Sequence, residues 1–124
     1  MTFTLSTRTS NPNNGATGNS KIAGIIRARK RKAERHAAWT KTLSIVGLNP
    51  RFPVVVTVCR IAPSNGLDPH DGLGASLKGT IDGIADGLGL KSDRDPRVTW
   101  ALEQRRGPWG IEVRIEPKER SHAE

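Results

Sequence analysis

The sequence predicts an α+β fold, with a small mixed β-sheet and two main helices. Residues 53–60 (PVVVTVCR) form a β-branched run that is apolar on both faces, which is typical of a covered central strand. Residues 98–104 and 109–116 alternate between apolar and polar, as half-buried strands do. Residues 20–46 and 72–88 have helical patterns with capping residues at their ends. Together these segments favour one layered domain.

The length of 124 residues is enough for one modest hydrophobic core. We expect a flexible N-terminal segment over residues 1–20, one folded domain over residues 21–116 and a charged, frayed tail over residues 117–124. Within the first segment, residues 2–6 alternate weakly and could add a short edge strand.

The chain is strongly basic, with a formal net charge of +8 and a pI near 10.6. A polyanionic partner is therefore expected: DNA, RNA or an anionic membrane surface. No apolar run approaches the ~20 residues of a membrane span, and the N-terminus has no secretory signal pattern. The single Cys59 lies in an apolar strand and is interpreted as a core residue. These features predict a cytoplasmic protein.

The first helix is expected to begin near Asn19 or Ser20 and to end at Gly47. It carries a dense basic run that we expect to contact phosphates: Arg27, Arg29, Lys30, Arg31, Lys32 and Arg35. A solvated helix surface is the alternative. Trp39, just beyond the run, is interpreted as a core residue rather than a base-stacking platform.

The second helix is expected to be capped by Asp68 or Asp71 and to run to about Leu88. One stripe at helical spacing should face the core: Leu73, Leu77, Ile81, Ile84 and Leu88. A second stripe consists of glycines: Gly72, Gly79, Gly83 and Gly87. Small residues let another backbone approach closely, and that neighbour could be a strand, a partner subunit or a nucleic-acid strand.

All six aspartates lie between Leu67 and Val98, although the chain as a whole is basic. Asp71, Lys78 and Asp82 share one helix stripe, and Asp93 and Asp95 follow in a loop. Carboxylates with few His and no second Cys favour a hard cation, Mg²⁺ with Mn²⁺ possible, over zinc. A divalent ion beside a basic surface is what phosphodiester hydrolysis needs. A surface helix with a solvated charged face is the alternative interpretation.

The two alternating C-terminal segments are separated by a short turn at residues 105–108. This arrangement predicts an antiparallel hairpin. Trp100 and Trp109 are expected to lie in the core.

The pattern LDPHDGL…LK…IDGIADGLGL…DRDPRVTW resembles the RusA-type Holliday junction resolvases, in particular their divergent phage and prophage branch. Lys78 and Asp82 keep the family's four-residue spacing from Lys to Asp, and Asp95 and Val98 keep its three-residue spacing. The resemblance covers roughly residues 50–116 well and the N-terminal half only in outline.

This resemblance implies a homodimeric, Mg²⁺-dependent endonuclease that cuts branched double-stranded DNA. It implies catalytic roles for Asp71, Lys78 and Asp95, with Asp93 competing for the role of Asp95. The implied metal ligands are Asp68, Asp71, Asp93 and Asp95. We expect Asp82 and His70 to support these ligands from nearby.

Two positions depart from the family signature, since Pro69 stands where the first Asp is expected and Gly72 where the Asn is expected. They motivate an alternative, a non-catalytic junction- or DNA-binding protein on the same scaffold. An RNA-binding accessory protein ranks third, because an aromatic content of 4% provides few stacking platforms.

Overall fold

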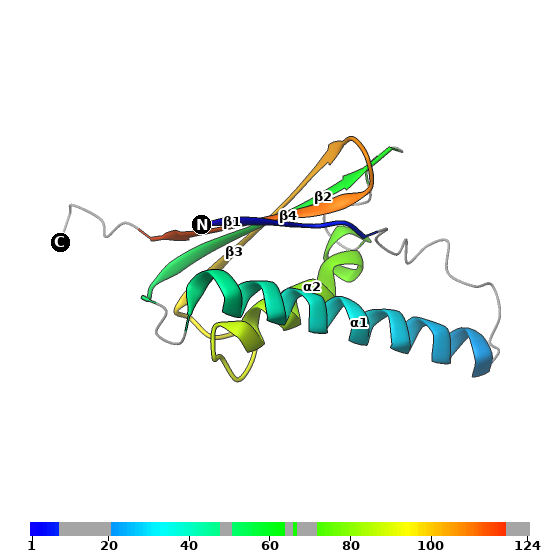
Figure 1. Cartoon of the computed structure of the whole chain (residues 1–124), viewed down its shortest axis with the longest axis horizontal. Coiled ribbons are helices and arrows are strands. Elements are labelled where there is room, and N and C mark those ends of the chain that lie inside the picture. Colours follow the sequence, from blue (N-terminus) through cyan, green and yellow to red (C-terminus); the bar gives the residue numbers. More distant parts are fainter. Residues whose placement is uncertain (8–20, 48–50, 64–65, 67–71, 119–124) are drawn as a thin grey trace.

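The computed structural model describes residues 1–7, 21–47, 51–63, 66 and 72–118, without the side chains of residues 21–23. The elements are β1 (Thr2–Leu5), α1 (Lys21–Val46), β2 (Val54–Ala62), α2 (Gly72–Gly87), β3 (Val98–Arg106) and β4 (Gly110–Pro117). They form two layers, with a twisted sheet above and both helices packed on one of its faces (Figure 1). The predicted α+β class, with a small mixed sheet and two main helices, is confirmed.

The strands are ordered β1-β4-β2-β3. β2 pairs in parallel with β3 and antiparallel with β4, and β4 pairs antiparallel with β1. The predicted edge strand near the N-terminus and the predicted central strand are both confirmed.

The predicted hairpin between β3 and β4 is wrong. The two strands run in opposite directions, but β2 lies between them and hydrogen-bonds to both. The Gly107–Trp109 connection crosses the end of β2, where the Gly107 amide donates to the Ala62 carbonyl at 3.0 Å. The physical reason is burial. β2 is buried on its helix-facing side at Val56 and Val58 and on its other side at Cys59, so the central position buries most apolar surface.

The core lies between the inner face of the sheet and the helices. All five residues of the predicted α2 stripe are buried: Leu73, Leu77, Ile81, Ile84 and Leu88. They meet inward side chains of β2 and β4, among them Val56, Val113 and Ile115. The helical period of 3.6 residues therefore located the core face of α2 from sequence.

The predicted end of α1 is confirmed at Val46, followed by Gly47 with φ of +75°, a conformation that favours glycine. Cys59 is buried as expected. The placement of Trp39 in the core is wrong, because 39% of its surface is exposed on α1. Trp100 packs half-buried against the core, and Trp109, also half-buried, lies with its ring centroid 5.6 Å from the Arg60 guanidinium.

Within the described part of the chain, neither helix combines the length and the apolar character that crossing a bilayer requires.

Candidate nucleic-acid interface and acidic site

The basic run lies on α1 and is largely exposed. Arg29, Lys32, His36 and Trp39 follow one another at spacings of three, four and three residues, which places them on one side of the helix. All four side chains are exposed, and the only acid in α1, Glu34, is buried on a different side. The rings of His36 and Trp39 are 5.5 Å apart between centroids. This side of α1 therefore presents positive charge next to an aromatic pair.

The remaining members of the predicted basic set behave differently from one another. Arg27 and Arg31 are exposed, and Lys30 is half-buried. Arg35 forms a two-pronged ion pair with Asp86 of α2, with Nε–Oδ2 at 2.6 Å and Nη2–Oδ1 at 2.9 Å. Arg35 therefore fastens the two helices together, and its guanidinium is already engaged.

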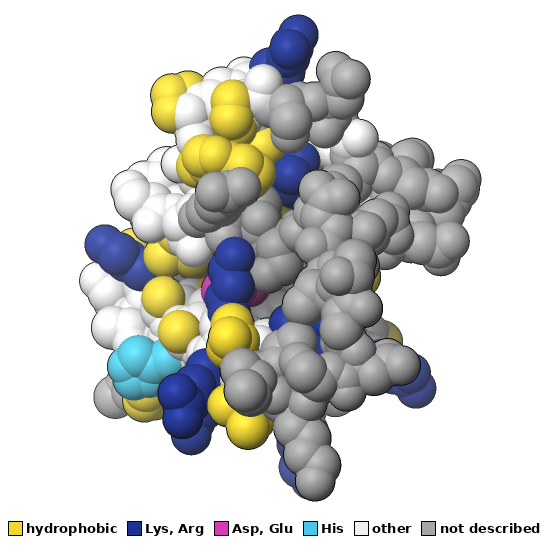
Figure 2. All heavy atoms as spheres, turned by 90° about the vertical axis from the view of Figure 1, so that its right-hand side faces the viewer, with side chains coloured by type: hydrophobic (Ala, Val, Ile, Leu, Met, Phe, Trp, Pro, Cys, Tyr) yellow, Lys and Arg dark blue, Asp and Glu magenta, His cyan; other side chains and the backbone are white. Residues whose placement is uncertain are grey.

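Figure 2 shows the face at which α1 begins. Lys and Arg side chains appear there at several places, with hydrophobic side chains and a His between them, and almost no Asp or Glu is visible. Among the described side chains visible on this face, Lys and Arg therefore outnumber Asp and Glu.

The neighbour of the glycine stripe is α1 itself, which is none of the three candidates considered from sequence. A Cβ on Gly79 would lie 3.0 Å from the Arg31 carbonyl oxygen, and a Cβ on Gly83 would collide with the carbonyl oxygen of Arg35. A Cβ on Gly87 would lie 2.6 Å from the Cβ of Thr42. The stripe brings the backbone of the basic helix directly against the acidic helix.

Lys78 of α2 joins two acidic residues that are distant in sequence. Its Nζ lies 3.0 Å from Oδ1 of Asp82 and 2.9 Å from Oδ2 of Asp93. The hydrogen bond with Asp93 raises the pKa of Lys78 and lowers that of Asp93. The main-chain oxygen of Asp93 accepts a 2.7 Å hydrogen bond from Nε1 of Trp100, which fixes the loop before β3. The expected proximity of Lys78, Asp82 and Asp93 is present.

Asp95 has a different partner. Its Oδ1 accepts hydrogen bonds from the Arg97 amide at 2.9 Å and from Nε at 3.1 Å, and its Oδ2 lies 2.9 Å from Nη2 of Arg97. These contacts lower the pKa of Asp95. The Arg97 guanidinium also lies 4.5 Å from the centroid of the Phe52 ring. Of the two competing aspartates, Asp93 is therefore the one that contacts Lys78.

Three predicted site residues, Asp68, His70 and Asp71, lie outside the described residues. Across the described ranges, no three Asp, Glu, His or Cys side chains are grouped closely enough to hold a metal ion. The two carboxylates that converge, those of Asp82 and Asp93, have the Lys78 ammonium between them. The predicted four-aspartate ligand set remains a prediction.

Sequence reasoning missed the partners that hold these groups. Asp95 could have been recognised from sequence as part of a turn, because an Asp side chain often accepts a hydrogen bond from the backbone amide two residues on, here that of Arg97. Glu34 was also missed, although it lies four residues before Ala38 and eight before Thr42, two small residues on the buried side of α1.

A scan against protein-family models finds no match to this sequence, and a search of curated proteins finds no significant match.

Proposed function

We propose that this protein is a Mg²⁺-dependent endonuclease that resolves four-way (Holliday) or otherwise branched DNA junctions by phosphodiester hydrolysis, in the manner of the RusA-type resolvases. In this proposal the active form is a cytoplasmic homodimer that serves recombination and repair. The observation that supports it best is the position of Lys78 between Asp82 and Asp93, on a helix packed against the basic helix α1.

Lys78 is suited to stabilise a phosphate. The raised pKa keeps its ammonium group charged at neutral pH. An ammonium has three N–H donors, and Asp82 and Asp93 account for two of them. The third is available for a phosphate oxygen, where negative charge builds up as the phosphodiester reacts. Trp100 holds the main chain of Asp93, so the position of Lys78 is supported from the sheet.

The metal ligands in this proposal are Asp68, Asp71, Asp93 and Asp95. Mg²⁺ or Mn²⁺ bound there would supply a water of lowered pKa and offset charge on the phosphate. Asp93 binds Lys78 through Oδ2.

Arg29 and Lys32 would hold the DNA backbone. Both are exposed on the same side of α1, with no acidic residue on that helix side. Contacts from such side chains to phosphates fix the register of a duplex without reading its bases. This suits a substrate that is defined by its branched shape.

A non-catalytic junction-binding protein is the second candidate. It is favoured by the ion pairs of Asp93 with Lys78 and of Asp95 with Arg97, since each of these carboxylates already has a cationic partner. Such a protein would bind junctions tightly and with a steep salt dependence, and Mg²⁺ would not affect binding.

The deciding experiment incubates a synthetic four-way junction with the purified protein and Mg²⁺. Wild type is compared with Asp71→Asn, Lys78→Gln and a matched control, Glu116→Gln, on an exposed residue of β4. The nuclease proposal requires symmetric cuts in wild type and Glu116→Gln that both site variants lose. Equal cutting by wild type and Asp71→Asn would assign the activity to a contaminant. Binding without cutting supports the second candidate, and light scattering of the free protein tests the homodimer.

A further inference from the structure

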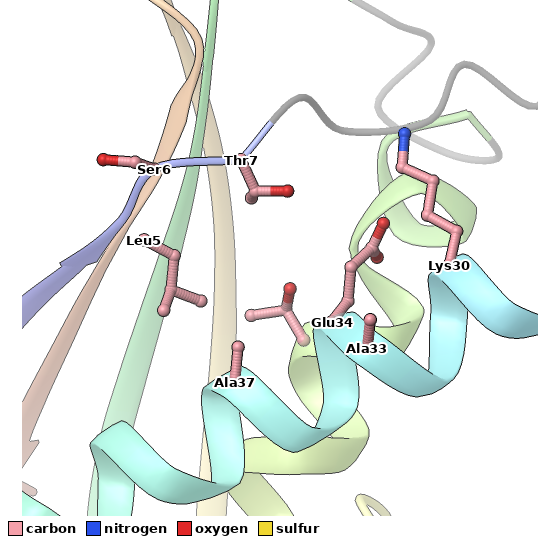
Figure 3. Close-up of a pocket in the computed structure, with 8 residues that line it drawn as sticks. Leu5, Ser6, Thr7, Lys30, Ala33, Glu34 and Ala37 are labelled. Carbon is pink, nitrogen blue, oxygen red and sulfur yellow. The ribbon is translucent and has the colours of Figure 1, made fainter.

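A small pocket opens between the end of β1 and α1 (Figure 3). Its volume is about 270 Å³. That is slightly below the range of about 300–1,000 Å³ in which proteins bind drug-sized molecules, so the pocket suits a ligand of one small ring system.

The apolar part of the pocket wall comes from Leu5, Ala33 and Ala37. Leu5 of β1 and Ala37 of α1 point toward each other across the pocket, and Ala33 lies one turn away on α1 (Figure 3).

Two buried polar groups in the pocket lack hydrogen-bond partners. Glu34 is 9% exposed, and its Oε1 has no hydrogen-bond partner among the described residues. Thr80 of α2 is fully buried, and its hydroxyl is likewise unpartnered within that part of the chain. Both residues line the pocket. Buried polar groups are nearly always satisfied in proteins, so the pair indicates a ligand with complementary polar groups.

A hydrogen-bond donor on a ligand would satisfy Oε1 of Glu34. The Glu34 carboxylate only accepts hydrogen bonds when ionised, and burial raises its pKa, while the charges of Lys30 and Arg31 act in the opposite direction. A donor bound to Oε1 would replace the water that burial removes. The Thr80 hydroxyl can either donate or accept.

The surrounding charge argues against a free cation as that donor. Lys30 lines the same pocket and projects from α1 on the same side as Glu34 (Figure 3), and the chain carries a net charge of +8. An uncharged ring with an amino group avoids this repulsion. If the ring is attached to a phosphate, Lys30 is placed to attract that phosphate.

We infer that this pocket binds an amino-bearing nucleobase, with the ring between Leu5 and Ala37 and the amino group donating to Glu34. The base could come from a free nucleoside or from an unpaired position in DNA, and the second source rests on the proposed function. Cytosine, adenine and guanine carry the amino group. Uracil and thymine have a carbonyl oxygen in place of the amino group, and this oxygen cannot donate to Glu34, so only their ring N3–H is left as a donor on that side.

The first experimental arm titrates the full-length protein with cytidine and with uridine, and follows binding by calorimetry and amide NMR shifts. These nucleosides differ at the ring position that carries the amino group in cytidine and a carbonyl oxygen in uridine. We expect cytidine to bind at least about tenfold more tightly than uridine. Glu34→Gln should bring the ratio close to one, and Glu116→Gln should leave it unchanged.

The second arm uses DNA duplexes that differ only in one bulged base, cytosine or thymine. Preference for cytosine here and for cytidine in the first arm assigns the pocket to the base itself. If cytosine is preferred only in the DNA duplexes, the pocket binds a base that is held in place through its phosphate. If cytidine is preferred only among the nucleosides, the pocket binds a free metabolite.

Ala33→Leu provides a second route to the same test, because it narrows the pocket from an exposed α1 position and leaves Glu34 in place. Circular dichroism confirms that each variant is folded. Folded wild type that shows no preference in either arm would overturn the inference. If the protein binds junctions but shows no base preference, the inference about the pocket fails and the proposed function stands. If it binds cytidine but not DNA, the proposed function fails and the inference about the pocket stands.

Discussion

The two helices lie on the same face of the sheet but differ in how much of their surface is covered. In α2, 11 of the 16 residues are buried. In α1, 26 residues long, the buried residues with described side chains are Glu34, Ala38 and Thr42. α2 is therefore mostly buried, whereas most of the surface of α1 is exposed.

The glycines explain how one sequence supports both roles. Gly79, Gly83 and Gly87 replace the side chains that would otherwise separate the helices, so α1 packs through a narrow strip of its surface. The rest of its surface carries arginines and lysines together with the exposed Ile25, Ile26 and Trp39. The glycines lower the helix propensity of α2, but they allow α1 to pack closely against it. Because this contact involves only one side of α1, the basic side of α1 stays exposed.

The largest expected effect comes from breaking this contact. Gly83→Leu places a side chain against the Arg35 carbonyl and the Ala38 methyl, and should lower the free energy of unfolding by about 1–3 kcal/mol or more. Urea denaturation measures the change. Gly24→Ala is the matched control, since no atom lies within 4 Å of its added methyl, and it should stabilise by up to about 1 kcal/mol. Equal effects of the two changes would mean that α1 and α2 do not pack as described.

The exposed side of α1 is tested by DNA affinity. Arg29→Ala with Lys32→Ala should reduce the slope of log affinity against log salt by about 1.8, or 0.9 for each lost phosphate contact. Fluorescence anisotropy with a labelled junction between 50 and 200 mM salt, roughly the range in which such contacts dominate, gives the slope. Arg105→Ala with Arg114→Ala is the charge-matched control, because these arginines pair with Glu112 and Glu103 on the uncovered face of the sheet. A larger decrease of the slope in the control variant would indicate that DNA binds to the uncovered face of the sheet instead of α1.

A smaller effect is expected at the buried acid of α1. Burial raises the pKa of Glu34, so its carboxylate disfavours the folded state at neutral pH. Glu34→Gln should therefore raise the free energy of unfolding at neutral pH. The gain should be absent below the ordinary value of 4.5, where both states are protonated, and should grow as pH rises through the folded pKa. A pH-independent gain would argue against burial as its cause.

The smallest effect concerns the partly exposed ion pair of α2. Lys78 lowers the pKa of Asp93, so the pair stabilises the fold above the ordinary value of 3.8, and this contribution is lost as pH falls through the lowered pKa. Lys78→Met should cost about 0.2–1 kcal/mol at pH 7, a screened value because 42% of the Lys78 side chain is exposed. Thermal unfolding measures the loss. Lys91→Met, in the turn after α2, serves as the control, and an equal loss there would attribute the effect to net charge.

The sequence alone located most of the elements and the core. Strand β2, the end of α1 at Gly47 and the apolar stripe from Leu73 to Leu88 all follow from local patterns, and the structure has them where expected. The cluster of Lys78 with Asp82 also followed from helical spacing, since residues four apart on a helix are neighbours.

What the sequence left open depended on pairs of segments far apart in the chain. The alternating pattern of β3 and β4 fits a hairpin as well as it fits two strands separated by β2, because alternation specifies a buried face and not a neighbour. The glycine stripe likewise specified a close contact without its partner. Asp93 meets Lys78 across 15 residues of sequence, and Glu34 and Thr80 come to line one pocket only after α1 and α2 have packed.

Local periodicity therefore determined which residues are helical, extended or buried. Tertiary packing decided the strand order, the partner of the glycines and which of Asp93 and Asp95 contacts Lys78. The physical reason is that periodicity reflects backbone geometry within a few residues, whereas these contacts depend on which distant surfaces bury the most apolar area together.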